Sequence, residues 1–332
     1  MARLPLAIAF AIIPALGEAQ SVAAPSLQPD ASVYGPIKPQ PKPNPHMQSK
    51  PKNKAKRFSL TLKAGVAYDS DVAISQINTS TGQSDKLVNL GLSANYKLVD
   101  TPKHSFSVGY DFTQSLHASL SNFDIQLHSF SANGSVVVRK ATAGLMYSYS
   151  HVLLGGHPFL DLQLVSPSVL IPVTHRIFAR PNYVYLDERF PISPTYNGTH
   201  NQPGMQVFYF FDQAHAFVLL GADYQREKTA GPELTYRGYA LSGTLSVPFR
   251  VLKVSGKAKA DYEWLSRDYD NITASIGVNR YDRASTFKLG AELPLKPKIS
   301  LGINAIHIGR KSNIAFANLD ENIASSELIY RF

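Results

Sequence analysis

The sequence predicts an all-β fold: a transmembrane antiparallel up-and-down β-barrel of about 14 strands, preceded by a disordered Pro/Lys-rich segment. Three observations predict it. Short segments after residue 57 alternate apolar and polar side chains with a period of two. The connections between these segments alternate between short and long, and the chain ends on one such segment, at Phe332.

The composition agrees with membrane strands better than with membrane helices. Tyr and Phe each occur 17 times, whereas charged residues make up only 17% of the 332 residues. Aromatic side chains suit a pleated surface, and a strand between lipid and water carries as many polar as apolar residues. No run of about 20 apolar residues follows the N-terminal segment, which excludes helical spans there. The chain has no cysteine, so disulfides, thiolate metal sites and a cysteine nucleophile are excluded.

Residues 1–19 are predicted to be a secretory signal peptide. Arg3 precedes an apolar stretch from Leu4 to Leu16, and Gly17-Glu18-Ala19 offers small residues for cleavage. Cleavage nearer Ala23 stays open. We therefore expect an exported protein.

Residues 20–57 are predicted to be a disordered periplasmic linker. Prolines and lysines interleave from Pro36 to Lys56, and proline supports neither a helix interior nor a strand ladder. Seven side chains in this stretch are basic and one is acidic, so it holds six of the nine net positive charges. Because the basicity is local, we expect no nucleic-acid partner. The linker is expected either to contact peptidoglycan, anionic headgroups or a periplasmic partner, or to act as a solvated spacer.

Residues 58–332 are predicted to form the barrel. The clearest strand has one apolar face, made by Leu252, Val254, Ala258, Ala260, Tyr262 and Trp264, and one charged face. The same alternation appears in residues 58–68, 88–98, 106–112, 143–149, 216–224, 239–249 and 287–293. Apolar rows often end in an aromatic residue, as an interfacial girdle requires. Pro167 interrupts one segment and the alternation slips near Ser129 and Ala305, so 12 or 16 strands stay open.

The connections predict the orientation of the barrel in the outer membrane. Short ones lie near residues 100–103, 139–140, 172–175, 212–214, 248–250 and 296–298. Longer ones lie near residues 69–85, 187–202, 268–283 and 312–320. Short turns on the periplasmic side and long loops outside are typical of these barrels, so both termini are expected in the periplasm. The last strand places Leu328, Tyr330 and Phe332 on one face, which resembles the C-terminal signal that the barrel-assembly machinery reads.

Both ends of the barrel segment resemble one family. Residues 310–314, 320–322 and 328–332 look like the end of the barrel domain in surface lipoprotein assembly modifiers, and residues 68–72 resemble its start. The resemblance implies an outer-membrane barrel that exports a protein or polysaccharide or assembles it at the surface. Members of that family carry a tetratricopeptide domain before the barrel, whereas residues 20–57 are too short for two repeats of about 34 residues.

Two other functions stay open: a porin or small-solute channel, and a structural envelope anchor. Partners expected in every case are outer-membrane lipid and the barrel-assembly machinery. The candidate site residues are charged side chains expected to line the lumen: Lys63, Lys97, Arg237, Lys253, Lys257, Lys259, Asp261, Glu263, Lys288 and Glu292.

No catalytic residue, metal ligand or cofactor is predicted. His128-Ser129 and Asn133-Gly134 bring together the residue types of a hydrolase, but their spacing does not fit one. His151, His157 and His200 are expected to be surface residues of connections, because the sequence places no third metal ligand beside them.

Overall fold

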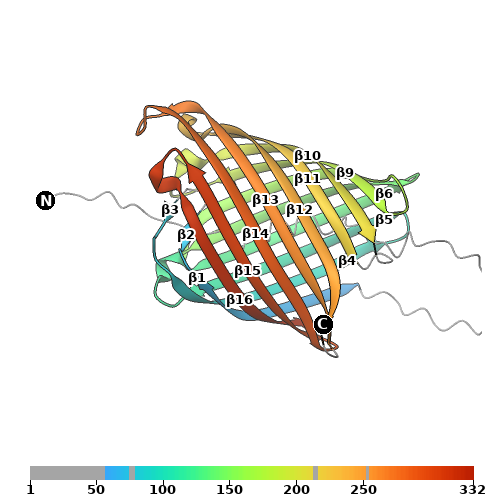
Figure 1. Ribbon diagram of the computed structural model, residues 1–332. Coiled ribbons are helices and arrows are strands. Elements are labelled where there is room, and N and C mark those ends of the chain that lie inside the picture. The colour runs from blue at the N-terminus through green and yellow to red at the C-terminus, as the bar shows by residue number, and fades with distance from the viewer. Residues whose placement is uncertain (1–56, 75–78, 212–215, 252–253) are drawn as a thin grey trace, which may run out of the picture.

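The computed structural model describes residues 57–74, 79–211, 216–251 and 254–332, and within them a closed antiparallel barrel of 14 strands (Figure 1). The predicted signal peptide, the predicted linker up to residue 56, and Lys253 lie outside the described residues. The barrel strands are β1 (Phe58–Asp69), β4 (Asp85–Asp100), β5 (His104–His117), β6 (Ile125–Val138), β7 (Ala141–Leu154), β8 (His157–Pro172), β9 (Ile177–Arg189), β10 (Gly198–Phe211), β11 (Ala216–Thr229), β12 (Tyr236–Val251), β13 (Val254–Thr273), β14 (Val278–Lys296), β15 (Ile299–Ser312) and β16 (Leu319–Arg331).

Each strand pairs with its neighbours in the chain, and β1 closes the sheet on β16. The closing ladder runs from Thr61 opposite Arg331 to Asp69 opposite Ile323. The backbone N–H of Phe332 adds a hydrogen bond of 2.8 Å to the carbonyl oxygen of Leu60. Closure removes the unpaired strand edges that a membrane could not satisfy. The predicted fold class and the strand number of 14 are confirmed.

The two ends of the barrel differ in their connections. One end has short turns at residues 101–103, 139–140 and 173–176, and the C-terminus lies at this end (Figure 1). The other end carries the longer segments 70–84, 118–124, 190–197, 230–235 and 313–318. Within them lie the two-stranded sheet of β2 (Ala73–Ile74) and β3 (Thr79–Ser80) and the 3₁₀ turns η3 (Ser121–Phe123), η4 (Pro194–Tyr196), η6 (Pro232–Leu234) and η7 (Ala315–Ala317).

Two of the predicted loops are too long. β9 continues to Arg189 and β10 begins at Gly198, while β13 continues to Thr273 and β14 begins at Val278. The polar residues at these strand ends continue the hydrogen-bonded ladder beyond the apolar belt, and their polarity had indicated loops. Within the described ranges, no helix has the length and apolar character to cross a membrane.

The outer face carries an apolar belt. On β1 the exposed residues are Phe58, Leu62, Val66 and Tyr68, whereas Lys63 and Asp69 belong to the opposite face. The other strands repeat this arrangement, with exposed aromatic residues toward both ends of the barrel. Examples are Tyr96, Phe106, Tyr209 and Tyr330 near the short turns, and Tyr224, Tyr239 and Tyr281 near the long loops. Such a belt between aromatic girdles is the surface that transmembrane barrels present to lipid.

The slips in the predicted alternation are not breaks in the strands. The ladders of β6 to β5 and β7 run without interruption through Ser129, and those of β15 to β14 and β16 run through Ala305. Leu127 faces inward at 4% exposure, while Phe130 faces outward at 56%. The alternation seemed to change register near Ser129 and Ala305 because apolar side chains also occupy the inner face there. Pro167 lies within β8, where the ladder to β9 is interrupted between Val165 and Ser168.

Candidate functional site

The inner surface of the barrel is the candidate functional site, and it has two unlike walls. We call the inward face of β6 to β11 the apolar wall. Two buried apolar clusters give it its name, although Arg180, His200 and Glu227 also face inward from β9 to β11. The apolar members are Ile125, Leu127, Met146, Val152, Leu154, Leu160, Leu162, Leu164, Leu170, Phe178, Leu186, Phe208, Phe210 and Phe217. We call the inward face of β12 to β16 and β1 the charged wall, since it holds most of the predicted lumen residues.

The described parts of the β1–β4 connection, residues 70–74 and 79–84, are fastened to each other by polar contacts. The Asp71 carboxylate accepts hydrogen bonds from Ser80 Oγ at 2.6 Å and from the Gly82 N–H at 2.9 Å. The Val72 N–H donates to the Gln83 carbonyl oxygen at 2.9 Å, and the Thr81 N–H donates to that of Val72 at 3.0 Å. Gly82 has a φ of 65°, which a residue without a Cβ adopts without strain. Residues 70–74 and 79–84 are therefore held together as a pair.

Residues 72–74 lie inside the mouth of the barrel. Val72 and Ile74 are fully buried in the apolar cluster of β6 to β9. Ala73 instead packs with Ile308 of β15 and Leu319 of β16, on the other side of the mouth. Because neighbouring residues of one short strand touch both walls, the segment reaches across the lumen. We call it the inserted segment.

Two neighbouring loops add to the apolar cluster at the mouth. Leu120 and Phe123, from the β5–β6 loop, and Tyr196, from the β9–β10 loop, pack against it. The Tyr196 ring lies 5.8 Å from that of Phe190, and burial raises the pKa of the Tyr196 hydroxyl. The mouth is thus narrowed from the apolar side.

Most of the sequence-predicted lumen residues stand at inward positions. These are Lys63, Lys97, Lys257, Lys259, Asp261, Glu263, Lys288 and Glu292. Several are paired: Lys63 with Glu327 at 3.4 Å, Lys259 with Asp261 at 3.0 Å, and Glu292 with Arg331 at 2.6 Å. Lys97 pairs with Asp100 at the end of the barrel that carries the short turns. The charged wall therefore presents both signs along the lumen.

The prediction that Arg237 lines the lumen is wrong. Arg237 shares its face of β12 with Tyr239 and Leu241, which are 59% and 51% exposed to the outside. Its guanidinium lies 3.6 Å from Asp270 at the rim. Tyr236 and Gly238 on either side of Arg237 face inward, and one residue of offset decides the face in a strand.

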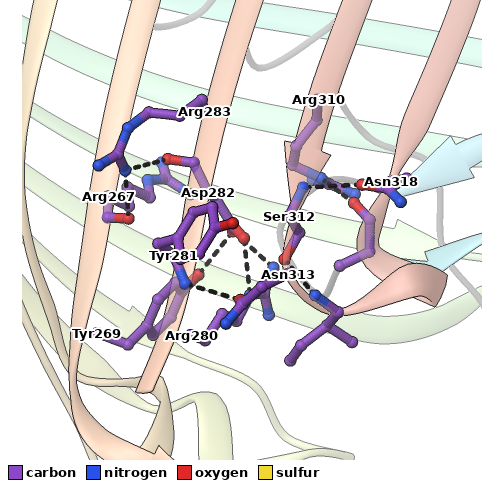
Figure 2. Close-up of polar contacts among 12 residues, drawn as sticks. Arg267, Tyr269, Arg280, Tyr281, Asp282, Arg283, Arg310, Ser312, Asn313 and Asn318 are labelled. Atoms are coloured by element: carbon purple, nitrogen blue, oxygen red, sulfur yellow. Dashed lines mark hydrogen bonds and ion pairs between the residues drawn. The ribbon is translucent and has the colours of Figure 1, made fainter. Parts of the chain in front are cut away.

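A buried polar network lies on the charged wall near the long loops (Figure 2). Arg280 donates to both carboxylate oxygens of Asp282, at 2.9 and 2.6 Å, and the Tyr269 hydroxyl donates to Asp282 at 3.1 Å. The Arg280 guanidinium also lies 4.7 Å from the Tyr269 ring centre, and Arg267 lies 4.6 Å from that of Tyr236. Sequence reasoning missed Tyr269, Arg280 and Asp282 because it assigned 268–283 to a loop, although Arg280 and Asp282 alternate with Tyr281 and Arg283 there.

The three histidines expected in connections all lie in strands, and His157 is exposed at the first residue of β8. His200 lies in β10, buried, with its Nδ1 2.7 Å from Glu227 and its Nε2 3.2 Å from Gln202. His151 lies on the outer face of β7, 2.7 Å from Asp161. The part of the chain that the structure describes holds no group of three His, Asp or Glu residues able to bind a metal ion.

His128 and Ser129 point to opposite sides of the barrel wall. His128 Nδ1 lies 2.8 Å from the Tyr110 hydroxyl on the outer face, whereas Ser129 contacts the inward Ser148 and Ser150. These two residues therefore cannot act together in a reaction.

Comparison with known proteins gives structural similarity only. No protein-family model and no curated protein matches the sequence, so the resemblance to surface lipoprotein assembly modifiers is not confirmed. OccAB3 of Acinetobacter baumannii is 10% identical, with 83% of this chain and 98% of that chain covered at a TM-score of 0.45. OmpT, an outer membrane protein of Vibrio cholerae, is 9% identical, with 84% and 99% covered at 0.45. CdiB from Acinetobacter baumannii is 9% identical at 0.43, and the match spans 83% of this chain but only 60% of CdiB. Similarities of this size carry no assignment of function.

Proposed function

We propose that this chain is an outer-membrane channel for small charged or polar solutes, narrowed at its mouth by the inserted segment. The long loops face outward and both termini face the periplasm. The observation that carries the proposal is the placement of Val72 and Ile74 on one wall and Ala73 on the other.

The geometry favours small solutes over large cargo. A protein or polysaccharide in transit would have to displace the inserted segment, which is held by fully buried apolar side chains. A small ion would pass along the charged wall, where both signs of charge can replace part of its hydration. The inward faces of β9 to β11 add further polar groups, among them Arg180, His200 and Glu227, so polar side chains line the path on both sides.

The proposal is tested by releasing the inserted segment and recording conductance in planar bilayers. A Val72→Asp, Ile74→Asp double variant buries two carboxylates in an apolar cluster. At a cost of about 3 kcal/mol, this shifts the balance between inserted and released states roughly a hundredfold toward release. We expect a small conductance from the native chain and a clearly larger one from the variant.

Phe316→Asp is the matched control, because Phe316 lies in η7 at the same end of the barrel but is 68% exposed. Its conductance should equal that of the native chain. If neither the native chain nor the double variant conducts while both remain folded barrels, the channel function is refuted.

A further inference from the structure

Three polar side chains meet on the outer face of the barrel, where the neighbouring residues form the apolar belt. They are Ser285 of β14, His307 of β15 and Asn322 of β16. His307 stands opposite Asn322 on one side and opposite Phe287 on the other, and Ser285 stands opposite Gly309. Phe287 is 45% exposed to the outside, which places the cluster on the lipid-facing side. Because the cluster does not face the lumen, it takes no part in the proposed channel.

The imidazole of His307 is oriented by Asn322. Its Nδ1 lies 3.0 Å from the Asn322 Oδ1. Because an amide oxygen can only accept, Nδ1 carries the proton and Nε2 is left with a free lone pair. Asp320, whose Oδ1 lies 3.8 Å from the same Nδ1, adds a negative charge on that side of the ring.

Nε2 and the Ser285 hydroxyl border the same gap. A Cβ placed on Gly309 would lie 3.6 Å from His307 Nε2 and also 3.6 Å from Ser285 Oγ. The gap is open because position 309 has no side chain. Ser285 and His307 are diagonal neighbours across the β14–β15 ladder, the offset at which side chains of a twisted sheet still interact. A hydroxyl, a base and an orienting amide thus lie on three neighbouring strands, and they are the residue types that nucleophilic hydrolysis uses.

The cluster lies at the boundary between the apolar belt and the charged rim. Toward the loops, Arg283 and Lys311 stand opposite each other, one ladder step beyond Ser285 and Gly309. Toward the membrane centre lie Phe287 and Leu289, and Trp264 stands opposite Ser285 on β13. An interfacial Trp beside an apolar belt marks the depth at which lipid headgroups meet their acyl chains. The ester carbonyls of membrane lipids lie at this depth.

An apolar hollow lies on the same face, one ladder step from the cluster toward the membrane centre. Its lining includes Leu289 and Ala291 of β14, Ile303 and Ala305 of β15, Ala324 of β16 and Val66 of β1. The hollow also reaches Val88 of β4 and Leu116 of β5, so it is an apolar surface against which acyl chains can pack. Lys311 stands where the phosphate of the same lipid would lie, beside Arg283, whose guanidinium donates to Asp268 at 2.9 Å and to the carbonyl oxygens of Arg267 and Asp282.

We propose that Ser285 and His307 are catalytic residues that hydrolyse a carboxylic ester of a membrane glycerophospholipid. Ser285 Oγ bonds to the ester carbonyl carbon while His307 Nε2 takes the hydroxyl proton. The bond from carbonyl carbon to glycerol oxygen then breaks, and His307 returns the proton to that oxygen, which releases the lysolipid. Water attacks the acyl-serine, gives a proton through His307 back to Ser285 Oγ, and frees the fatty acid. Asn322 is a positioning residue that holds the imidazole.

The test uses the full mature chain in vesicles of phosphatidylethanolamine and phosphatidylglycerol, with released fatty acid and lysolipid measured by mass spectrometry. A fluorophosphonate probe reports the nucleophile as a labelled peptide. We expect label on the peptide that contains Ser285. Ser285→Ala and His307→Ala should each lower fatty-acid release at least about a hundredfold. Asn322→Ala should lower it as well, and Asn322→Asp, which keeps the acceptor, should retain it.

Gly309→Val fills the gap between Nε2 and Oγ and should abolish labelling while the barrel still forms. His151→Ala removes another outer-face histidine with an acidic partner, and Ser129→Ala removes an inward hydroxyl, so both should behave as the native chain. The proposal is overturned if Ser285→Ala releases fatty acid like the native chain, or if the native chain neither reacts with the probe nor releases fatty acid. Bilayer conductance of the same variants should stay native, which separates this activity from the channel.

Discussion

Ala73, on the segment inserted into the mouth, packs against Ile308 on the inner face of β15. The chain has no native cysteine, so Ala73→Cys with Ile308→Cys creates one defined disulfide that locks the segment. We expect the oxidised lock to suppress the conductance gained by Val72→Asp with Ile74→Asp, and a reductant to restore it. Single-channel recording before and after reduction checks this. Failure of the two cysteines to cross-link under oxidation would contradict the inserted position.

The lysines of the charged wall should set ion preference. Lys257→Glu with Lys259→Glu reverses two charges on the inward face of β13. We expect the reversal potential under a salt gradient to move toward cation selectivity. A change of about 1 kcal/mol corresponds to roughly a fivefold change in permeability ratio. Arg237→Glu is the control, because it reverses a charge on the outer face, and it should leave the reversal potential unchanged.

The seam between β1 and β16 should depend on Gly65. A Cβ at this position would collide with the backbone carbonyl oxygen of Ser326, whereas a Cβ at Gly134 would meet only the Phe106 ring, at 3.7 Å. Gly65→Ala should therefore destabilise the barrel by about 1–3 kcal/mol, and Gly134→Ala should have little effect. Thermal unfolding in detergent, followed by circular dichroism, measures both. Equal unfolding temperatures for the two variants would argue against close approach at the seam.

The terminal Phe332 should matter more for assembly in cells than for stability. Its ring lies 4.5 Å from the Lys298 ammonium, a contact of about 0.5–1 kcal/mol at an exposed site. Phe332→Ala should refold from denaturant almost as the native chain does, yet give much less barrel in the outer-membrane fraction. Lys298→Ala removes the same contact but keeps the ring, so its assembled amount should be native. A parallel loss in both variants would show that the contact matters and the terminal signal does not.

The sequence predicted the architecture through local alternation. The two faces of each strand and the unequal connections are visible in short stretches of sequence, and counting those stretches gives an even strand number. The structure confirms 14 strands, with the barrel closed by β1 and β16. The same alternation indicated inward positions for residues such as Lys63 and Lys257. The prediction for Arg237 was wrong because this residue stands at the polar rim. There the alternation of polar and apolar residues ends, and only the ladder register shows which face a side chain occupies.

The sequence could not show which inner surface is covered. Leu127, Ile306 and Ile308 blurred the apparent alternation, because an apolar residue facing inward looks like a change of register when the covering segment is unknown. That covering segment lies far away in the chain. Local pattern thus determined the strands and their two faces, whereas the mouth, the buried Arg280–Asp282 network and the Ser285–His307–Asn322 cluster arose only when closure of the sheet brought distant strands into contact. Side-chain alternation is a property of neighbours in the chain, and contact between strands is a property of the closed barrel.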